Sequence, residues 1–314
     1  MASKSGNCFL PARYYLLLLD LVRNHGASLD PLIKRADIDI AGMSEPNSLL
    51  RIDQVDALIA AAVEVTGRDD LGFLLGRLIK PSNHELLGYA LMTSATLDEA
   101  LRIAARYWPL ITPTFILRHE PLASGVRIHL RPALPLKPLS RRFHIEAIAA
   151  AFHAEISFLL STQIPTYTIH LPEYLANAAP RYRQLAPARV LFDANHEMGL
   201  IIELPTAMLV RPLSLADRSA LNMARQRCDD ELSRLTRQGS LADWIGMMLD
   251  QSNDHQPRQQ ELARILHLST RTLNRRLADE GTHLRELGLQ SRHRRACQLL
   301  AETDLPITRI ALQL

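Results

Sequence analysis

The chain has 314 residues, of which 47% are hydrophobic and 22% charged. This length and composition exclude a disordered chain and leave room for two domains with cores of their own. The formal net charge of +3 is carried by the C-terminal end, because residues 251–314 hold ten arginines against seven acidic residues. A modestly basic C-terminal domain on a neutral body is typical of a protein that joins a sensor to a nucleic-acid-binding unit.

The cysteines and the N-terminus indicate a cytoplasmic protein without a membrane span. Cys8, Cys228 and Cys297 lie far apart and show no metal-ligand spacing, as expected in a reducing compartment. The apolar run Tyr14–Leu19 is followed at once by Asp20 and is too short to cross a membrane.

The first 110 residues predict a series of helices. Their apolar residues recur at helical spacing, and Gly67, Pro81 and Pro109 interrupt the pattern. The predicted helices are Ala12–Asn24, one that starts at Asp30-Pro31, Asp53–Thr66, Leu71–Ile79, Glu85–Thr93 and Leu97–Trp108.

Beyond residue 110 the pattern changes to strands around one long helix. Thr114–His119 and Val126–Arg131 flank the turn 123–125 and predict a hairpin. Leu139–Thr162 is apolar on most sides and predicts a buried helix. Further strands are predicted at Tyr167–Leu171, Val190–Phe192 and Leu200–Leu204. The fold class is therefore an α+β body, mostly helical with a small sheet, followed by an all-α C-terminal domain.

A charged amphipathic helix is predicted between these two parts. It covers Ser214–Arg237, follows Pro212 and is broken by Gly239-Ser240, so we expect a connector or an oligomerisation surface. Leu241–Leu249 then begins the last domain, with core residues expected at Trp244, Ile245 and Met248.

Pro257–Ala278 has the pattern of two short helices joined by a tight turn. Leu262, Ile265 and Leu266 form an apolar stripe on the first helix. Ser269 is placed to cap the second helix, Thr270–Ala278. This arrangement is that of a helix-turn-helix with its recognition helix.

The second helix has two distinct faces. Leu273 and Leu277 lie on one face, while Arg271, Asn274 and Arg275 share the other. Arg hydrogen-bonds guanine and Asn hydrogen-bonds adenine in the major groove, so the polar face is suited to reading base edges. A solvated helix hairpin with a charged outer face is the alternative interpretation of this stretch alone.

Two more helices are predicted after it. Leu284–Ala301 forms a connecting helix with Arg292, Arg294 and Arg295 available to phosphates, and Pro306–Leu314 starts another helix. The latter repeats the first helix of the helix-turn-helix at an offset of 48 residues.

Two sets of motifs resemble a known family. The run R-A-x-x-L-L-x-x-T-x-x-P-I-x-x-I-A at Arg295–Ala311, after L-S-x-R-T-L-x-R-R-L at Leu268–Leu277, resembles the AraC/XylS family of bacterial transcription regulators. The motifs L-P-E-Y and V-L-F-D-A-N within Leu171–Asn195, with L-x-x-P-L at Leu209–Leu213, are similar to the non-cupin "arabinose-binding type" sensor domain of one branch of that family.

The resemblance implies a domain organisation and a set of partners. It implies an effector-sensing and dimerisation domain at 1–211, a linker helix at 212–238, and a helix-turn-helix DNA-binding domain at 239–314. Its partners would be double-stranded DNA, an unidentified small-molecule effector, a second copy of the chain in a homodimer, and RNA polymerase. Family members continue with Gly-Phe and a complete second recognition helix, so we expect the second helix-turn-helix to be incomplete here, either because the natural product is longer or because this one is truncated.

The resemblance also places DNA contacts. The family's base-reading positions fall on Arg271, Asn274 and Arg275, in agreement with the polar face derived above. We expect phosphate contacts from residues of the turn, of the recognition helix and of the connecting helix: Ser269, Thr270, Thr272, Arg276, Arg292 and Arg295.

Four ionisable residues of the long apolar helix are candidates for an effector pocket. Glu146 and His153 fall on one helical face, and His144 and Glu155 fall on the opposite face. An effector pocket is usually an apolar cavity with a few polar groups, and these four residues would supply such groups. The alternative, which we favour, is that they pair with neighbouring helices or with the backbone.

Motifs of catalysis and metal binding are missing from the sequence. It has no G-x-S-x-G, no Walker loop and no G-x-G-x-x-G, and His84-Glu85-Leu86-Leu87-Gly88 lacks the second His of a zinc-protease motif. We therefore predict a ligand-responsive, DNA-binding transcription regulator, an activator or a repressor, and not an enzyme. We expect no catalytic residue, no metal and no cofactor. The alternative is a cytosolic enzyme or small-molecule-binding protein whose C-terminal helices serve protein interaction.

Overall fold

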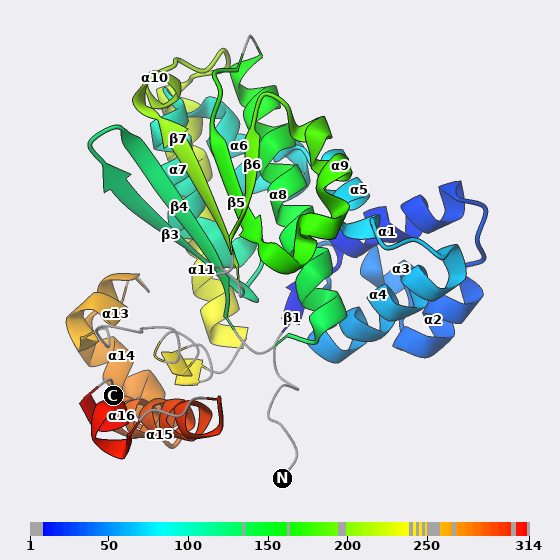
Figure 1. The fold of residues 1–314 in the computed structure, drawn as a ribbon. Helices are drawn as coiled ribbons and strands as arrows, with labels where there is room; N and C mark the ends of the chain where they lie inside the picture. Colours follow the sequence, from blue (N-terminus) through cyan, green and yellow to red (C-terminus); the bar gives the residue numbers. More distant parts are fainter. Residues whose placement is uncertain are drawn as a thin grey trace. The chain divides into compact units, whose positions relative to one another are not determined.

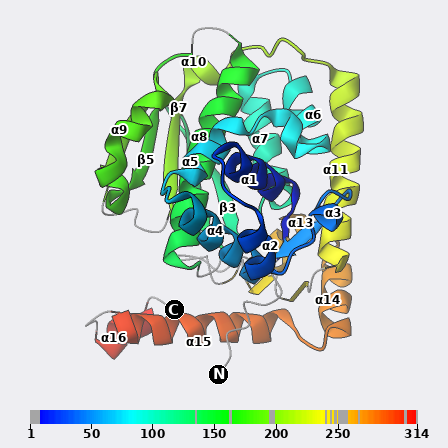
Figure 2. The same ribbon diagram turned by 90° about the vertical axis from the view of Figure 1, so that its right-hand side faces the viewer.

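A computed structural model gives the fold of the chain (Figures 1 and 2). The structure describes residues 9–133, 136–161, 164–193, 199–238, 241–242, 245–246, 249, 258–265, 268–302 and 306–312. The chain divides into two compact units, unit 1 from Met1 to Asp230 and unit 2 from Glu231 to Leu314.

Unit 1 begins with a short pair of strands that brings its first helices together. Strands β1 (Phe9–Pro11) and β2 (Leu49–Arg51) pair antiparallel, with Leu10 opposite Leu50. The sequence did not predict this pair, because three residues are too few to show a strand pattern. The helices of this part are α1 (Arg13–Asn24), α2 (Asp30–Ala36), α3 (Ile40–Met43) and α4 (Ile52–Thr66).

The next α-helices agree with the predicted series to within one residue at each boundary. They are α5 (Leu71–Leu78), η2 (Pro81–His84), α6 (Leu86–Thr93), α7 (Leu97–Tyr107) and η3 (Trp108–Leu110). The helix predicted from Glu85 starts one residue later, because Glu85 has a positive φ of 53° and ends a separate 3-10 turn. That turn includes His84 and holds its side chain in the interior, where 4% of the residue is exposed.

A mixed sheet forms one side of unit 1. Among the described residues it has five strands in the order β3-β4-β7-β5-β6, antiparallel except for the parallel pair β5 and β6. The strands are β3 (Phe115–Leu122), β4 (Gly125–Pro132), β5 (Thr168–Pro172), β6 (Arg189–Asp193) and β7 (Leu200–Pro205). Alternate residues of β4 are buried, and Ile128 lies opposite Ile202 of β7. This period of two gives the sheet one apolar face, against which α7 and α8 lie (Figure 1).

Helix α8 (Pro138–Leu160) is the central helix of unit 1, as the apolar run predicts. It packs closely on α5, because a Cβ atom at Gly72 or Gly76 would overlap the backbone carbonyl oxygens of Phe143 or Ala147. By length and composition α8 is apolar enough to cross a membrane, but 67% of its most apolar window is buried within the described structure. The same features are found in the core helix of a globular domain.

The rest of unit 1 consists of short turns and the start of a long helix. The turns are η4 (Glu173–Ala178), α9 (Ala179–Tyr182), η5 (Arg183–Leu185) and α10 (Thr206–Leu209). Helix α11 (Arg218–Gln238) was expected from Ser214 but begins four residues later, because the Asp217 carboxylate accepts hydrogen bonds from the backbone N–H groups of Ser219 and Ala220. Its first half belongs to unit 1 and is anchored there by the buried side chains of Leu221, Ala224 and Cys228.

Unit 2 is helical in all its described elements. They are α13 (Gln259–Ile265), α14 (Thr270–Asp279), α15 (Leu284–Glu302) and α16 (Ile307–Leu312), and Figure 2 shows α16 at the far end of the long helix α15. Its core comprises Leu241, Ile245, Leu249, Leu262, Ala263, Leu273, Leu277 and Leu287. Ile245 is buried as predicted, whereas Trp244, Met248 and Leu266 lie outside the described residues.

Candidate functional site

Helix α14 is fixed in unit 2 by its cap and by its inner face. Its N-cap Ser269 accepts a hydrogen bond at Oγ from the backbone N–H of Thr272, at 3.1 Å. Leu273 and Leu277 are fully buried in the core of unit 2. The predicted cap and the predicted inner face of this helix are therefore confirmed.

The opposite face of α14 carries the residues expected to read bases. Arg271, Asn274 and Arg275 are all exposed. The amide oxygen of Asn274 accepts a hydrogen bond from Nε2 of Gln259 at the start of α13, which orients the Asn274 side chain before any partner arrives. The two guanidinium groups and the amide thus project from a rigid helix.

Asn274 and Arg275 also line a basic groove within unit 2. Here "basic groove" means the concave surface lined by Leu249, Arg258, Gln259, Asn274, Arg275, Ala278, His283, Leu284, Arg285, Gly288 and Arg292. None of these lining residues is acidic, so the lining itself supplies guanidinium groups and no carboxylate. Arg258, His283 and Arg285 were not singled out from the sequence, because Arg258 lies far along the chain from His283 and Arg285.

The other residues expected to contact phosphate have varied surroundings. The hydroxyls of Ser269 and Thr272 hydrogen-bond each other at 2.8 Å, and Thr270 is exposed. Arg276 is half-buried, and its Nη1 is a buried atom that has no partner among the described residues. The side chain of Arg295 lies outside the described part of the chain.

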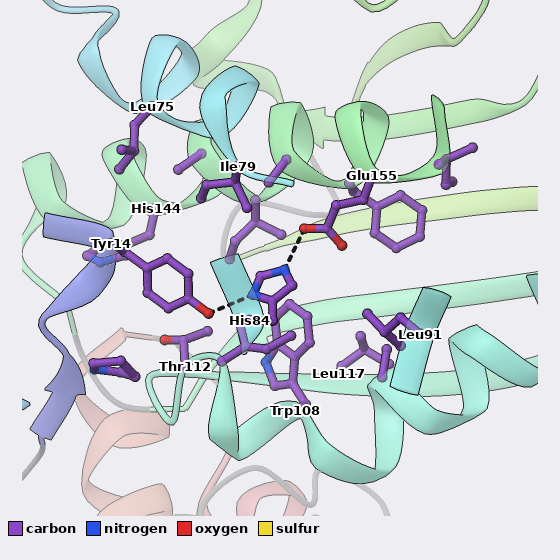
Figure 3. Close-up of a pocket in the computed structure, with 18 of the residues that line it drawn as sticks. Tyr14, Leu75, Ile79, His84, Leu91, Trp108, Thr112, Leu117, His144 and Glu155 are labelled. Carbon is purple, nitrogen blue, oxygen red and sulfur yellow. Dashed lines mark hydrogen bonds and ion pairs between the residues drawn. The ribbon is translucent and has the colours of Figure 1, made fainter. Parts of the chain in front are cut away.

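Unit 1 contains an apolar cavity beside α8. Its volume is about 100 Å³, and its walls come from β1, α1, α5, α6, α7, β3 and α8 (Figure 3). Most of the wall is aliphatic or aromatic, with Trp108 among the ring side chains, while Tyr14, His84 and Glu155 contribute polar groups. This composition is that of a site for small molecules.

A chain of hydrogen bonds crosses one wall of the cavity. Figure 3 shows Tyr14, His84 and Glu155 pointing toward one another. The Tyr14 hydroxyl lies 2.6 Å from Nδ1 of His84, and Nε2 of His84 lies 2.7 Å from Oε1 of Glu155. Burial opposes the charged form of His84, but the Tyr14 oxygen and the Glu155 carboxylate outweigh it and raise the pKa of His84 to about 10. At neutral pH the ring is therefore an imidazolium that donates at both nitrogens.

His144, the other cavity residue predicted from α8 besides Glu155, is neutral. Its Nδ1 lies 2.7 Å from the backbone oxygen of Ser140, so Nδ1 carries the proton. Its Nε2 then accepts from the Tyr15 hydroxyl at 2.8 Å. Burial lowers the pKa of His144, which keeps this tautomer uncharged.

Glu146 and His153 lie outside the lining of the cavity. Glu146 is fully buried and accepts hydrogen bonds from Arg181 and Tyr182, each at 2.7 Å, and burial raises its pKa despite these partners. His153 pairs with the Tyr167 hydroxyl at 2.8 Å, and its pKa is lowered by burial and by Arg77. The structure thus brings His144 and Glu155 to the cavity and leaves Glu146 and His153 with neighbouring elements.

Comparisons with known proteins agree for both units. Residues 26–213 match the family model described as the arabinose-binding domain of AraC transcription regulator, N-terminal. Over 97% of this chain and 89% of the relative, the sequence is 29% identical to the ornithine utilization regulator of Pseudomonas aeruginosa. It is 26% identical to an uncharacterized HTH-type transcriptional regulator of Mycobacterium tuberculosis, over 95% of this chain and 87% of that one.

A solved structure supports the fold. The transcriptional regulator CdpR from Pseudomonas aeruginosa is similar with a TM-score of 0.51 and 22% sequence identity, over 95% of this chain and 90% of that chain. The family match covers more than half of the sequence, and the two relatives extend the likeness over nearly the whole chain, including the capped helix α14 of unit 2. This chain therefore belongs to the AraC family of transcription regulators, in the branch that carries this arabinose-binding type of N-terminal domain, and is not an enzyme.

Proposed function

We propose that the chain is a ligand-responsive regulator that reads the DNA major groove with α14 and senses a small molecule in the cavity of unit 1. The observation that carries the proposal is the two-faced helix α14, with Leu273 and Leu277 buried and Arg271, Asn274 and Arg275 exposed. A helix with this exposed set fits the major groove, where Arg and Asn make bidentate contacts to purines.

The basic groove supports a second part of the proposal, the phosphate contacts. Arg292 lines it, as do Arg258 and Arg285. Contacts of this kind position a protein on the duplex without reading sequence. We assign Ser269, Thr270, Thr272, Arg276 and Arg295 to the same role.

Effector binding requires a cavity whose occupancy favours one state of the protein over another. A ligand shifts such an equilibrium only by its differential affinity for the two states. The cavity joins α1, α7 and α8, so a ligand that moves these helices apart would alter the surface of unit 1. We further propose a homodimer that pairs through α11, where Met223 is 62% exposed. As a regulator of DNA the protein would act in the bacterial cytoplasm.

DNA binding by the full chain tests this proposal. DNA from the protein's own promoter region is compared with random DNA by fluorescence anisotropy over a range of salt concentrations. We expect preference for the promoter fragment and a steep loss of affinity with salt, because bound phosphates release counterions. Equal affinity for both DNAs would contradict base reading by α14. Sedimentation of the free chain tests the dimer.

A further inference from the structure

The cavity of unit 1 has a size that limits its occupant. Its volume is about 100 Å³, and an apolar cavity of about 150 Å³ in another protein binds benzene. Side chains such as Leu75, Leu91, Trp108 and Leu117 supply an apolar wall (Figure 3). Because this cavity is smaller than the benzene site, its occupant is a molecule of at most one ring with an apolar body, and the side chains of the wall must shift slightly to admit it.

Most polar groups of the wall already satisfy one another. Tyr15 donates to His144, and the hydroxyls of Thr112 and Thr114 hydrogen-bond each other at 2.7 Å. The Trp108 indole donates to the backbone oxygen of Phe115 at 2.9 Å. Glu155 binds His84 through Oε1, and its Oε2 has no hydrogen-bond partner in the part of the chain that the structure describes. The wall thus offers a ligand one strong acceptor.

The charges of the wall are balanced without a ligand. The His84 side chain is 3% exposed and that of Glu155 is 17% exposed, and the two form an ion pair at 2.7 Å. A carboxylate on the ligand would add a second negative charge beside Glu155. An ammonium group could donate to Oε2 of Glu155, but it would turn the balanced His84–Glu155 pair into a cluster with a net positive charge. A net charge inside an apolar wall is strongly unfavourable. The ligand is therefore neutral.

We propose that this cavity binds a small neutral alcohol or phenol, with its apolar body beside Trp108 and its hydroxyl donating to Oε2 of Glu155. This inference deepens the effector role proposed above and rests on it.

A series of one-ring probes tests the ligand class. Benzene, phenol, benzoate and benzylamine are titrated into the full chain by calorimetry, with thermal shift as a second readout. We expect phenol to bind about tenfold more tightly than benzene, since a hydrogen bond to a charged group adds affinity. We expect benzoate and benzylamine to bind at least about tenfold more weakly than phenol. Equal or tighter binding of either ion, an equal affinity for benzene, or no binding of phenol would overturn the proposal.

Variants assign the binding to the cavity. Ala104 lines the cavity on α7, so Ala104→Leu should abolish phenol binding, whereas Ala105→Leu on the same helix, outside the lining, should leave it unchanged. Glu155→Leu should bind benzene but lose the preference for phenol, and its benzene binding reports that it is folded. If Glu155→Leu does not fold, the probe series and the Ala104 pair still decide.

Failure of the ligand class is distinguishable from failure of the proposed function. Phenol that binds wild-type chain but not Ala104→Leu, without changing the affinity for promoter DNA, would uphold the ligand class and remove the effector role. Selective DNA binding by a chain that does not bind phenol would overturn the ligand class and leave DNA recognition intact.

Discussion

The cavity of unit 1 and the basic groove of unit 2 use charge in opposite ways. In the cavity the imidazolium of His84 is compensated by Glu155 inside an apolar wall. In the groove Arg258, Arg275 and Arg285 meet no acidic residue of the lining, and solvent reaches them. A compensated pair in an apolar wall selects a neutral molecule, whereas uncompensated surface cations attract a polyanion such as DNA.

The cavity and the basic groove also differ in the structural elements that support them. The basic groove depends on the outer face of α14. The helix itself is anchored by Leu273 and Leu277, which lie on its inner face in the core of unit 2. The cavity depends on Tyr14, His84 and Glu155, which come from three elements. The groove should therefore be damaged by changes in the small core of unit 2, and the cavity by breaking its hydrogen-bonded chain.

The largest expected effect comes from the core beneath the groove. Leu273→Ala should destabilise unit 2 by about 2–5 kcal/mol, because it removes a fully buried side chain and leaves a cavity. We expect loss of DNA binding and an unchanged melting transition of unit 1 in calorimetry. Leu289→Ala is the matched control, since Leu289 is 53% exposed. A shift of the unit 1 transition would show that the two sites are not independently held.

The next effect is a pH dependence of unit 1. His84 has its pKa raised to about 10, while an unfolded His titrates near about 6.5. Its stabilising contribution is therefore fully present below pH about 6.5 and is lost as the pH rises toward about 10. We expect a loss of up to about 3 kcal/mol, the lower end of what breaking a buried ion pair costs.

Urea unfolding between pH 6 and pH 10 measures this effect. His84→Gln cannot titrate at this position, so its unfolding free energy should be lower at pH 6 and should change less with pH. Parallel curves for wild type and His84→Gln would refute the assignment of the pH dependence to His84.

The third prediction concerns DNA affinity and distinguishes the residues of α14 that contact bases from those that contact phosphates. Arg271→Ala should cost about 1–3 kcal/mol on the preferred DNA and little on random DNA, since a bidentate base contact is lost. Arg276→Ala should weaken both DNAs alike, because phosphate contacts carry no sequence information. Anisotropy titrations with both DNAs give the two ratios, and an equal loss on both DNAs for Arg271→Ala would count against its base contact.

The sequence predicts helix α14 better than the cavity of unit 1, because the residues that determine α14 are close together in the chain. Leu273, Leu277 and the cap Ser269 lie within nine residues, so helical periodicity and capping rules apply directly. The same periodicity separated the His144–Glu155 face of α8 from the Glu146–His153 face, and in the structure Glu155 contacts His84 whereas Glu146 contacts Arg181.

The partners of Glu155 could not be predicted from local patterns. Tyr14 and His84 are 70 residues apart, and His84 and Glu155 are 71 residues apart. In the sequence, His84 was considered only as part of an incomplete zinc-protease motif. Its contacts in the structure arise because η2 lies next to Tyr14 of α1 and Glu155 of α8. The pairing of β5 with β6 likewise depends on the 3-10 turns between them, which have no apolar periodicity of their own.

The smallest effect separates two roles of Ser269, the observed helix cap and the proposed phosphate contact. Ser269→Ala should destabilise unit 2 by about 1 kcal/mol through loss of the cap. Ser269→Asp keeps a capping oxygen and adds a negative charge at the helix N-terminus, so the stability of unit 2 should be retained. If Ser269 contacts a phosphate, Ser269→Asp should nevertheless weaken promoter and random DNA alike, because its carboxylate repels the backbone. Wild-type affinity of the stable Ser269→Asp protein would leave Ser269 as a cap without a DNA contact, and the phosphates would then be bound by the arginines of the basic groove.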